Sequence, residues 1–355
     1  MDDNKKQELE KQQYRLVGSH SAVKVCGWTK NMIRGKGGCY KMKFYGIMSH
    51  QCLQMTTCLS CANRCVFCWR GHKEPVSKVW KGAVDDPSMI VDESIKSHID
   101  LLQGFKGGLN ANKKILSEMK DVKHVALSLT GEPILYPKLN ELLALFNKRG
   151  ISTFIVTNGQ YPEQIKSMDK VTQFYISLDA PSKDLLKKVD VPLFSDYWER
   201  LLESLKIMSE RNDRTCLRLT LVKDMNIVDP KGYSELIKLG DPDFVEVKGY
   251  MFVGQSRQRL KESNMPLHEE VVEFSKELLK HLPDYDIVSE HIPSRVVLLG
   301  KKKFFKRGKW STWIDFGKWN EFVNSGKDFS KEDYALPTPE TGLSGKGTLD
   351  YWKFD

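Results

Sequence analysis

The sequence predicts an α/β protein whose main body is a partial (βα)6 barrel of the TIM type. From about residue 120 onward, short apolar, β-branched runs alternate with segments of helical period, which is typical of βαβ units and a parallel sheet. The apolar runs are nearly continuous, as expected for strands covered on both faces. Six strands are expected before residue 252, which favours an open barrel over a closed eight-fold one. Periodicity alone does not distinguish this barrel from a doubly wound sheet.

The predicted elements begin with a short polar helix at 2–15. Residues 18–57 are rich in Gly, Cys and aromatic side chains and show little periodicity, so a bound metal would organise this segment. The segment after Gln54 supplies the first strand. Further strands are expected at 123–129, 152–157, 172–178, 215–222, 244–251, 285–289 and 295–299, with helices at 138–149, 195–211, 230–239 and 268–281.

We expect three regions. Residues 1–57 form a cysteine-rich N-terminal extension, residues 58–290 the barrel, and residues 291–355 a basic and aromatic C-terminal extension. The last segment contains prolines and glycines but ends in three aromatic residues, and a disordered tail rarely keeps such residues. We therefore expect the tail to dock on the barrel. Its aromatic residues are Tyr351, Trp352 and Phe354.

Composition indicates an ordinary globular protein, with 355 residues of which 40% are hydrophobic and 28% charged. The first residues are charged and polar and lack the apolar core of a signal peptide. The longest apolar runs, such as Val125–Leu129, are far shorter than a membrane span. We expect a cytoplasmic monomer with no membrane partner.

The cysteines are clustered rather than scattered. The chain has 8 cysteines, and all but Cys216 lie between Cys26 and Cys68. Cytoplasmic proteins rarely build a disulfide framework. Clustering of this kind favours metal or redox chemistry over isolated core thiols.

Cys58, Cys61, Cys65 and Cys68 fall within one short run. The last three form a C-x3-C-x2-C pattern, which can hold three irons of a four-iron cluster and leave the fourth open to a substrate. All four could instead form two C-x2-C zinc knuckles, but such knuckles are usually separated by about 12–20 residues. A bacterial ferredoxin run has another order, with proline after the last cysteine, where this chain has Trp69.

With Phe67 before its last cysteine, the C-x3-C-x2-C run resembles the signature of the radical S-adenosylmethionine enzymes. The resemblance implies a barrel of the radical S-adenosylmethionine type. It also implies a 4Fe–4S cluster whose open iron chelates the cofactor's amino and carboxylate groups. One electron from the cluster then cleaves the sulfonium to a 5′-deoxyadenosyl radical. The run follows the first strand, at the end of a barrel where active sites lie.

Polar residues follow the next three strands. Gly131 and Glu132 resemble the glycine–glutamate motif by which the superfamily holds the methionine amino group: Gly131 permits close backbone approach, and Glu132 can accept from an ammonium. Asn158, Ser177 and Asp179 end the following two strands, and we expect them to face the cofactor. Each of these residues equally suits an ordinary turn.

Cys26, Cys39 and Cys52 form a second set at equal spacing. Three thiolates from loops could hold a second four-iron cluster, again with one open iron. They could equally be three buried thiols that act as small core residues. The spacing alone favours neither interpretation.

A wider resemblance covers most of residues 20–255. The run from Cys39 to Thr57, the cysteine motif through Arg70, Leu-Thr-Gly-Glu-Pro133, Thr-Asn-Gly159, Ser-Leu-Asp-Ala-Pro181 and Val-Glu-Val-Lys-Gly-Tyr-Met251 are similar to the tRNA 4-demethylwyosine synthase family. The eukaryotic form has an added flavodoxin-like domain, for which this chain has no room. The chain therefore resembles the archaeal type. Cys58 departs from the usual pattern and is interpreted either as a packed thiol or as a cause of mis-ligation under oxidation.

This family resemblance implies a carbon–carbon lyase that condenses pyruvate with N1-methylguanosine beside the anticodon of phenylalanine tRNA. It implies two 4Fe–4S clusters: Cys61, Cys65 and Cys68 match the S-adenosylmethionine cluster, and Cys26, Cys39 and Cys52 match the auxiliary one. A radical on the N-methyl group adds to pyruvate, a one-carbon fragment leaves, and an amine–carbonyl condensation closes the ring of this wybutosine precursor. An external electron donor, such as a flavodoxin or ferredoxin, is also implied.

An amine–carbonyl step suits a lysine with a lowered pKa. Lys41 and Lys43, just after Cys39, are the leading candidates for the group that forms a Schiff base with pyruvate or holds it. Lys248, with Glu246, is a lesser candidate at a strand end. Most lysines are solvated surface residues, so this interpretation depends on the family resemblance.

A tRNA partner would explain the net charge of +9, because Lys and Arg neutralise phosphates and aromatic rings stack on an extruded base. A solvated charged loop is the simpler interpretation of the basic stretch at 301–310. The candidate RNA contacts are Arg34, Lys36, Arg70, Lys303, Lys306 and Arg307.

Two alternatives of other classes remain. The chain could be a radical enzyme that acts on a peptide or small molecule, which predicts no tRNA binding. It could also be a zinc-stabilised RNA-binding module without catalysis, which predicts a colourless protein with little iron.

Overall fold

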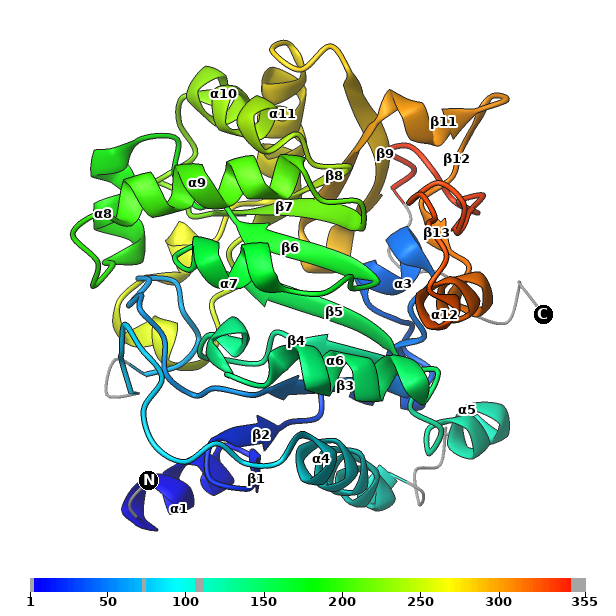
Figure 1. Cartoon of the computed structure of the whole chain (residues 1–355). Helices are drawn as coiled ribbons and strands as arrows, with labels where there is room; N and C mark the ends of the chain where they lie inside the picture. The colour runs from blue at the N-terminus through cyan, green and yellow to red at the C-terminus, as the bar shows by residue number, and fades with distance from the viewer. Residues whose placement is uncertain (1–2, 72–74, 106–111, 346–355) are drawn as a thin grey trace.

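Six parallel strands form the centre of the molecule. A computed structural model describes residues 3–71, 75–105 and 112–345. Within these ranges, strands β3 to β8 pair in chain order and all run parallel (Figure 1). They are β3 (Cys52–Thr56), β4 (His124–Leu127), β5 (Ser152–Thr157), β6 (Gln173–Ser177), β7 (Arg214–Leu221) and β8 (Phe244–Gly249). The predicted α/β architecture with six parallel strands is confirmed.

Antiparallel strands extend this sheet at both edges. The strand order is β1-β2-β3-β4-β5-β6-β7-β8-β10-β9, a 10-stranded sheet. β1 and β9 lie at its two edges and do not pair with each other, so the barrel is open. The added strands are β1 (Arg15–Val17), β2 (Ser21–Val23), β9 (Tyr285–His291) and β10 (Val296–Lys301).

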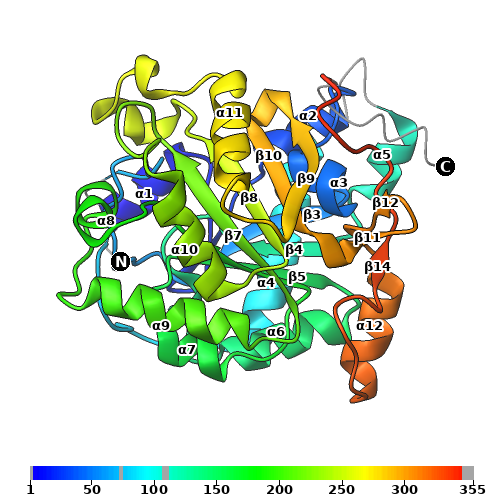
Figure 2. The same ribbon diagram turned by 90° about the horizontal axis from the view of Figure 1, so that it is seen from above.

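Helices connect the parallel strands, and α6, α7 and α9 cover one face of the sheet (Figures 1 and 2). The helices of this layer are α4 (Pro87–Leu102), α6 (Leu139–Lys148), α7 (Pro162–Ser167), α8 (Lys183–Asp190), α9 (Tyr197–Ser209), α10 (Pro230–Gly240) and α11 (His268–Leu279). Helix α4 was not predicted, although its start is well marked. Asp86 accepts hydrogen bonds from the amides of Ser88 and Met89, and Pro87 occupies the first turn. In the described residues no helix is both long and apolar enough to cross a membrane.

The N-terminal segment adds short elements around the barrel. The predicted helix at 2–15 ends early, because β1 follows within a few residues of α1. α3 is buried against β9 and β13 and ends at Gly46, whose φ of 77° is left-handed. The helices of the N-terminal half outside the barrel layer are α1 (Asp3–Lys11), α2 (Gly27–Ile33), α3 (Tyr40–Tyr45) and α5 (Lys113–Glu118).

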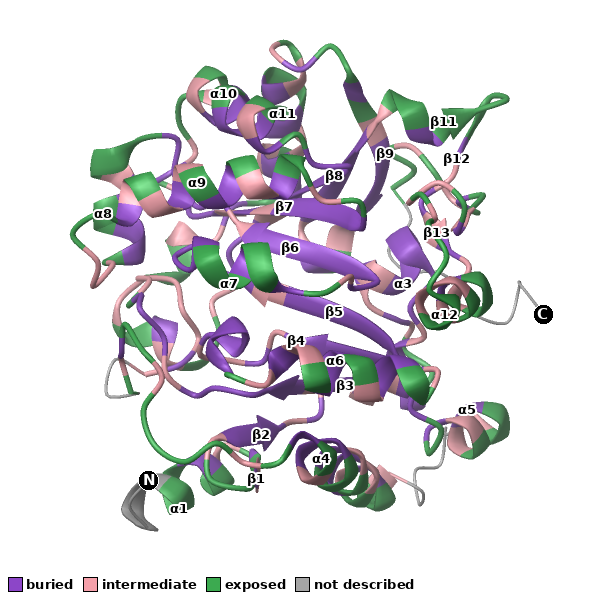
Figure 3. Ribbon diagram, in the orientation of Figure 1, coloured by how far each residue is buried: buried purple, intermediate pink, exposed green. Residues whose placement is uncertain are grey.

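The C-terminal segment packs on the sheet and shares a core with it (Figure 3). Trp310, Trp319 and Tyr334 are buried in the same cluster as Tyr45 and Phe244. The elements are β11 (Phe305–Lys306), β12 (Lys309–Trp310), β13 (Trp313–Ile314), α12 (Phe316–Ser325) and β14 (Ala335–Leu336). The boundary expected between residues 290 and 291 falls inside the β9–β10 hairpin, so the extension begins within the sheet itself. The aromatic residues after 350, which we predicted to dock on the barrel, lie outside the described ranges.

Replacing Trp319 by alanine tests how strongly this extension contributes to the fold. The Trp319 side chain is fully buried, and its ring centroid lies 5.2 Å from that of Tyr334 and 5.6 Å from that of Phe329. We expect the free energy of unfolding to fall by about 3–5 kcal/mol in urea denaturation, because a large cavity replaces the ring. Phe305, 49% exposed in the same region, is the matched control, and its replacement by alanine should cost less than about 1 kcal/mol. Equal effects of the two substitutions would contradict a shared core.

Candidate active site

A loop with three neighbouring cysteines follows β3 at the carboxyl ends of the parallel strands. The Cys61 sulfur accepts hydrogen bonds from the backbone amide of Asn63 and from Asn158 Nδ2, both at 3.4 Å. Burial, followed by the charges of Asp190, Cys68 and Cys61, raises the pKa of the Cys65 thiol. The structure therefore brings together the three cysteines of the C-x3-C-x2-C run.

Cys58 belongs to the hydrophobic core rather than to this group. It is 5% exposed, packs in the main core cluster and donates its thiol hydrogen to the Ser60 carbonyl at 3.6 Å. Burial raises the pKa of its thiol to about 11. This environment suits a packed thiol and offers no support for a four-cysteine zinc site.

The donor set fits a 4Fe–4S cluster better than a single ion. All three cysteines are free. Three thiolates are the ligands that bind three irons of such a cluster and leave the fourth iron open. Burial raises the pKa of the Cys61 thiol to about 12, and iron would have to displace its proton.

Gly131 and Glu132 lie directly against this loop. The φ of Gly131 is 66°, and a Cβ there would stand 1.9 Å from the Cys58 carbonyl oxygen, so only glycine fits. The Glu132 amide donates to the Ser60 carbonyl at 2.8 Å. Glu132 Oε2 accepts from the Asn158 amide at 2.9 Å, while Oε1 is buried without a hydrogen-bond partner in the described chain. Burial raises the pKa of this carboxyl to about 7. An ammonium group would satisfy Oε1.

The other predicted cofactor contacts differ in their surroundings. Asn158 reaches the Cys61 sulfur, and Ser177 lies half-buried at the carboxyl end of β6. Asp179 is buried, and its Oδ1 accepts from the Thr220 amide at 3.0 Å, so one of its oxygens serves the neighbouring strand. Burial raises the pKa of Asp179 to about 6. The sequence did not single out Asp190, whose carboxylate accepts from Asn63 Nδ2 at 3.3 Å.

The second cysteine set gathers at the amino end of the same strand. Cys26 and Cys39 precede the first turns of α2 and α3, and Cys52 is the first residue of β3. Burial, followed by the charges of Cys39 and Cys26, raises the pKa of the Cys52 thiol. The two cysteine sets thus flank β3, which has 5 residues and is roughly 17 Å long.

Among the three candidate lysines, Lys41 is the one whose amine is held by ring faces alone. Its Nζ lies 4.2 Å from the Tyr175 ring centroid and 6.0 Å from that of Phe154, and in the described chain it has no hydrogen-bond or ion-pair partner. Burial lowers its pKa, the charge of Glu246 opposes that shift, and Cys52 lies near enough to influence the same amine. Lys41 therefore lies beside the second cysteine set.

Lys43 and Lys248 are engaged elsewhere. Lys43 is 1% exposed, and its Nζ lies 3.9 Å from Glu340 Oε2. Lys248 Nζ donates to the Ser294 carbonyl at 2.7 Å, and burial lowers its pKa to about 8. Both remain close to the site, but each amine already has an oxygen partner.

Charged residues inside the barrel strands complete this region, and of these the sequence analysis named Glu246 but missed Arg218. Arg218 Nη1 on β7 donates to the Tyr40 hydroxyl at 3.2 Å, and its charge acts on both Lys41 and Lys248. Glu246 on β8 accepts from the Tyr45 hydroxyl at 3.0 Å. A charged residue within an otherwise apolar strand was the available signal.

The candidate RNA contacts are exposed, paired with acidic residues, or, in the case of Arg70, buried. Arg34, Lys36, Lys306 and Arg307 are exposed, the last two in the β11–β12 hairpin. Lys303 is paired with Asp243 at 2.8 Å and with Glu332 at 3.2 Å, so its charge is already balanced.

The surroundings of Arg70 do not support its predicted contact with RNA. Arg70 is only 6% exposed, and its guanidinium binds the carbonyls of Leu59, Asn63 and Pro75 instead of facing solvent. A side chain satisfied in this way is not available to a phosphate.

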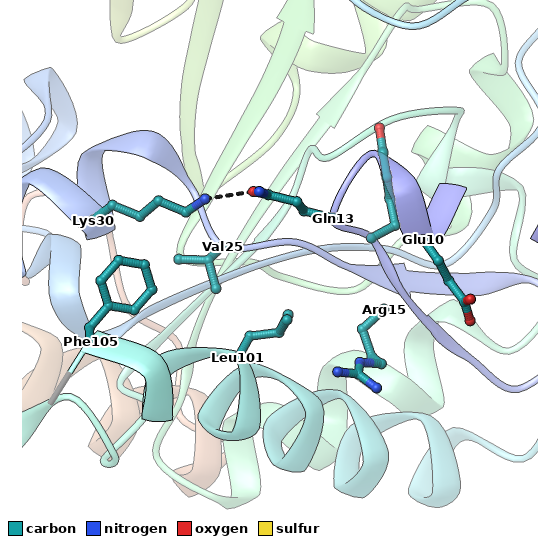
Figure 4. A pocket seen from close by; sticks show the side chains of 8 residues that line it. Glu10, Gln13, Arg15, Val25, Lys30, Leu101 and Phe105 are labelled. Carbon is teal, nitrogen blue, oxygen red and sulfur yellow. Dashed lines mark hydrogen bonds between the residues drawn. The ribbon is translucent and has the colours of Figure 1, made fainter. Parts of the chain in front are cut away.

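A pocket of about 530 Å³ lies between α1, β1, α2 and α4 (Figure 4). Lys30 donates to Gln13 at 2.8 Å across it, and Val25, which precedes Cys26, forms part of its wall. The full lining is Glu10, Gln13, Tyr14, Arg15, Val25, Lys30, Leu101 and Phe105. None of the predicted site residues lines this pocket.

Comparison with known proteins gives consistent matches. A family model of the radical SAM superfamily matches residues 55–237, and a model of wyosine base formation matches residues 239–301. The solved "Structure of TYW1 with a lysine-pyruvate adduct bound" is 36% identical, with a TM-score of 0.78 and coverage of 85% of this chain and 97% of that chain. The "Crystal structure of archaeal TYW1" is 32% identical, with a TM-score of 0.70 and the same coverage of both chains.

Curated relatives are longer. The S-adenosyl-L-methionine-dependent tRNA 4-demethylwyosine synthase TYW1 of Mus musculus is 49% identical over 346 residues, which are 95% of this chain and 48% of the relative. The synthase of Oryza sativa subsp. japonica is 48% identical over 340 residues, which are 95% of this chain and 52% of the relative. The chain thus spans about half the length of the curated relatives it matches.

The parallel barrel, the C-x3-C-x2-C loop at its carboxyl end and the superfamily match over 55–237 define a radical S-adenosylmethionine protein. The fold class predicted from the sequence is confirmed in this respect as well. Within that superfamily, the chain belongs to the TYW1 family, as its match to nearly the whole of a solved TYW1 chain establishes.

Proposed function

We propose that this chain condenses N1-methylguanosine, beside the anticodon of phenylalanine tRNA, with pyruvate to form 4-demethylwyosine. One observation carries the proposal: two sets of three cysteines flank a single barrel strand, and Lys41, an amine held only by aromatic rings in the described chain, lies beside one set. The curated relatives are named for this activity, and one solved relative carries a lysine–pyruvate adduct.

In this proposal Cys61, Cys65 and Cys68 hold a 4Fe–4S cluster that, when bound, reductively cleaves S-adenosylmethionine to a carbon radical. The protein orients that cofactor. Glu132 Oε1, buried without a partner in the described chain, accepts from the methionine ammonium. Asn158 supports the Cys61 sulfur, and Ser177 and Asp179 line the same end of the barrel.

Cys26, Cys39 and Cys52 would hold an auxiliary 4Fe–4S cluster. Their thiols are neighbours, and iron binding would displace the protons that burial keeps on Cys26 and Cys52. Pyruvate would enter between this set and Lys41. The Arg218 guanidinium, together with Lys248, supplies positive charge suited to a carboxylate.

Lys41 is the proposed nucleophile toward the pyruvate carbonyl. Its amine has ring faces as neighbours, and burial favours its neutral, nucleophilic form. Attack forms a carbon–nitrogen bond and expels the carbonyl oxygen as water. Lys43 and Lys248 are less suited, because their amines already contact oxygen partners.

The remaining assignments follow the family resemblance. We propose an external one-electron donor such as a flavodoxin or ferredoxin, a monomeric cytoplasmic protein, and tRNA contacts by the exposed Arg34, Lys36, Lys306 and Arg307. We also propose that residues 291–345 act with the barrel as one body, because their aromatic side chains share its core.

The test is an anaerobic assay with reconstituted protein, S-adenosylmethionine, a chemical reductant, pyruvate and tRNA that carries N1-methylguanosine. We expect label from the pyruvate methyl carbon to appear in the tRNA, and label from the carboxyl carbon to be lost with the one-carbon fragment. tRNA with unmethylated guanosine is the matched control and should take up no label. Cofactor cleavage without labelled tRNA would indicate another substrate, and a colourless zinc protein would indicate the RNA-binding module.

A further inference from the structure

The segment that follows β8 contacts the cysteine loop. In the described chain, residues 250–267 contain only the short 3₁₀ turns Gly254–Gln258 and Glu262–Asn264. The Gln255 amide donates to the Trp69 carbonyl at 2.9 Å. Gly254 has a φ of 59°, and a Cβ there would stand 2.4 Å from the same carbonyl. The two segments therefore touch backbone to backbone, immediately after Cys68.

Arg259 makes the principal connection. Its Nε donates to the Val66 carbonyl at 3.0 Å, and its Nη2 donates to the carbonyls of Cys68 and Arg70, the latter at 3.2 Å. These carbonyls belong to every second residue of the loop, so one planar guanidinium holds one side of the backbone that carries Cys68. Guanidinium is suited to this role because it offers several donors in a rigid plane.

Arg70, which belongs to the loop itself, binds the backbone on either side of Cys61. Its guanidinium donates to the carbonyls of Leu59 at 3.2 Å, Asn63 at 3.2 Å and Pro75 at 3.3 Å. Arg70 offers its own carbonyl to Arg259, so the two arginines form a chain. Buried loop carbonyls need such partners, because no helix or strand supplies them.

The Arg259 charge also acts on the cysteines. The Arg259 guanidinium donates to the Cys68 carbonyl, so its positive charge lies beside a residue proposed to bind the cluster. A cluster bound by thiolates becomes more negative on reduction, and a nearby cation favours that step. Arg259 can therefore affect both the geometry of the loop and the ease with which its cluster is reduced.

We propose that Arg259 is a positioning residue that fixes the Cys65–Cys68 half of the loop and stabilises the reduced cluster. Arg259 lies in the part matched by the wyosine base formation model, residues 239–301, whereas the loop lies in the part matched by the superfamily model, residues 55–237. A family-specific segment thus sets the conformation of the general radical-forming loop. The inference rests on the proposed placement of a cluster at Cys61, Cys65 and Cys68.

The test compares Arg259→Ala and Arg259→Lys with Arg257→Ala. Arg257 is the matched control, because it is exposed and bonds only the Phe252 carbonyl of its own segment at 3.1 Å. The readouts are iron release to a chelator, the electron paramagnetic resonance spectrum of the reduced cluster with and without S-adenosylmethionine, and the reduction potential. Each variant is measured in the full chain and in a background with Cys26, Cys39 and Cys52 replaced by alanine, where only one cluster is expected.

For Arg259→Ala we expect iron release to accelerate about 10- to 100-fold, the range typical when a residue that supports a metal ligand is lost. The reduction potential should become more negative, and the spectral response to S-adenosylmethionine should weaken. Arg259→Lys should recover the potential more than the iron retention, because lysine restores the charge but not three carbonyl bonds. If the Arg259→Ala variant does not fold, the Arg259→Lys variant still tests the inference.

The inference would be overturned if both Arg259 variants matched Arg257→Ala in all three readouts: the rate of iron release, the spectrum and the reduction potential. An unmodified chain that binds no iron after reconstitution would instead count against the proposed cluster, so the two failures are distinguishable. The measurements use neither tRNA nor pyruvate, and they are independent of the proposed substrates.

Discussion

Replacing Cys61, Cys65 and Cys68 together by alanine is expected to abolish cleavage of S-adenosylmethionine, with activity falling to the level of a sample without protein. Iron should drop from about eight to about four atoms per chain, because one of the two proposed four-iron clusters loses all its ligands. The three thiols lie in the loop that follows β3 at the carboxyl ends of the strands, whereas the Cys58 thiol packs in the hydrophobic core. Iron analysis and measurement of 5′-deoxyadenosine test this.

Cys58→Ala is the matched control in the same loop. Its thiol packs in the hydrophobic core and bonds the Ser60 carbonyl, so iron content and cofactor cleavage should be retained. Loss of iron in the Cys58 variant, or tightly bound zinc in the unmodified chain, would favour the two-knuckle interpretation instead. The pair of variants therefore separates a cluster of three ligands from a zinc site of four.

The parts of the fold predicted from sequence are those governed by local pattern. β5 was predicted at 152–157 and lies at Ser152–Thr157, because its residues are nearly all apolar or β-branched and both its faces are covered. Helices α7 and α8 were missed, because segments of 6 and 8 residues carry too few turns for a clear period. β1 and β2 were missed for a similar reason, since each has 3 residues and forms by pairing at the edge of an existing sheet.

The candidate site shows the same division. The C-x3-C-x2-C spacing is local, and so it could be recognised directly from the sequence. The choice among three lysines depends on partners far along the chain, such as Tyr175 for Lys41 and Ser294 for Lys248. Arg70 was assigned to RNA because arginine neutralises phosphates, yet its guanidinium binds carbonyls of the folded loop. No sequence pattern indicates that a loop will bury its own arginine.

Replacing Lys41 by arginine is expected to reduce 4-demethylwyosine formation by at least about 10³-fold, which corresponds to about 4 kcal/mol of transition-state stabilisation. Arginine retains the positive charge, but its guanidinium stays protonated and forms no imine with pyruvate. Cofactor cleavage should continue, because Lys41 lies beside the second cysteine set at the other end of β3. The measurements are nucleosides from digested tRNA and 5′-deoxyadenosine from the same reaction.

A trapping experiment separates the nucleophile from the neighbouring amines. The unmodified chain, incubated with pyruvate and cyanoborohydride, should gain one reduced pyruvate unit on the peptide that contains Lys41. Lys43→Ala and Lys248→Ala should still be labelled, because those amines contact Glu340 and the Ser294 carbonyl while Lys41 stays between its two rings. Label on Lys248, or product from the Lys41→Arg variant at the unmodified rate, would move the nucleophile away from Lys41.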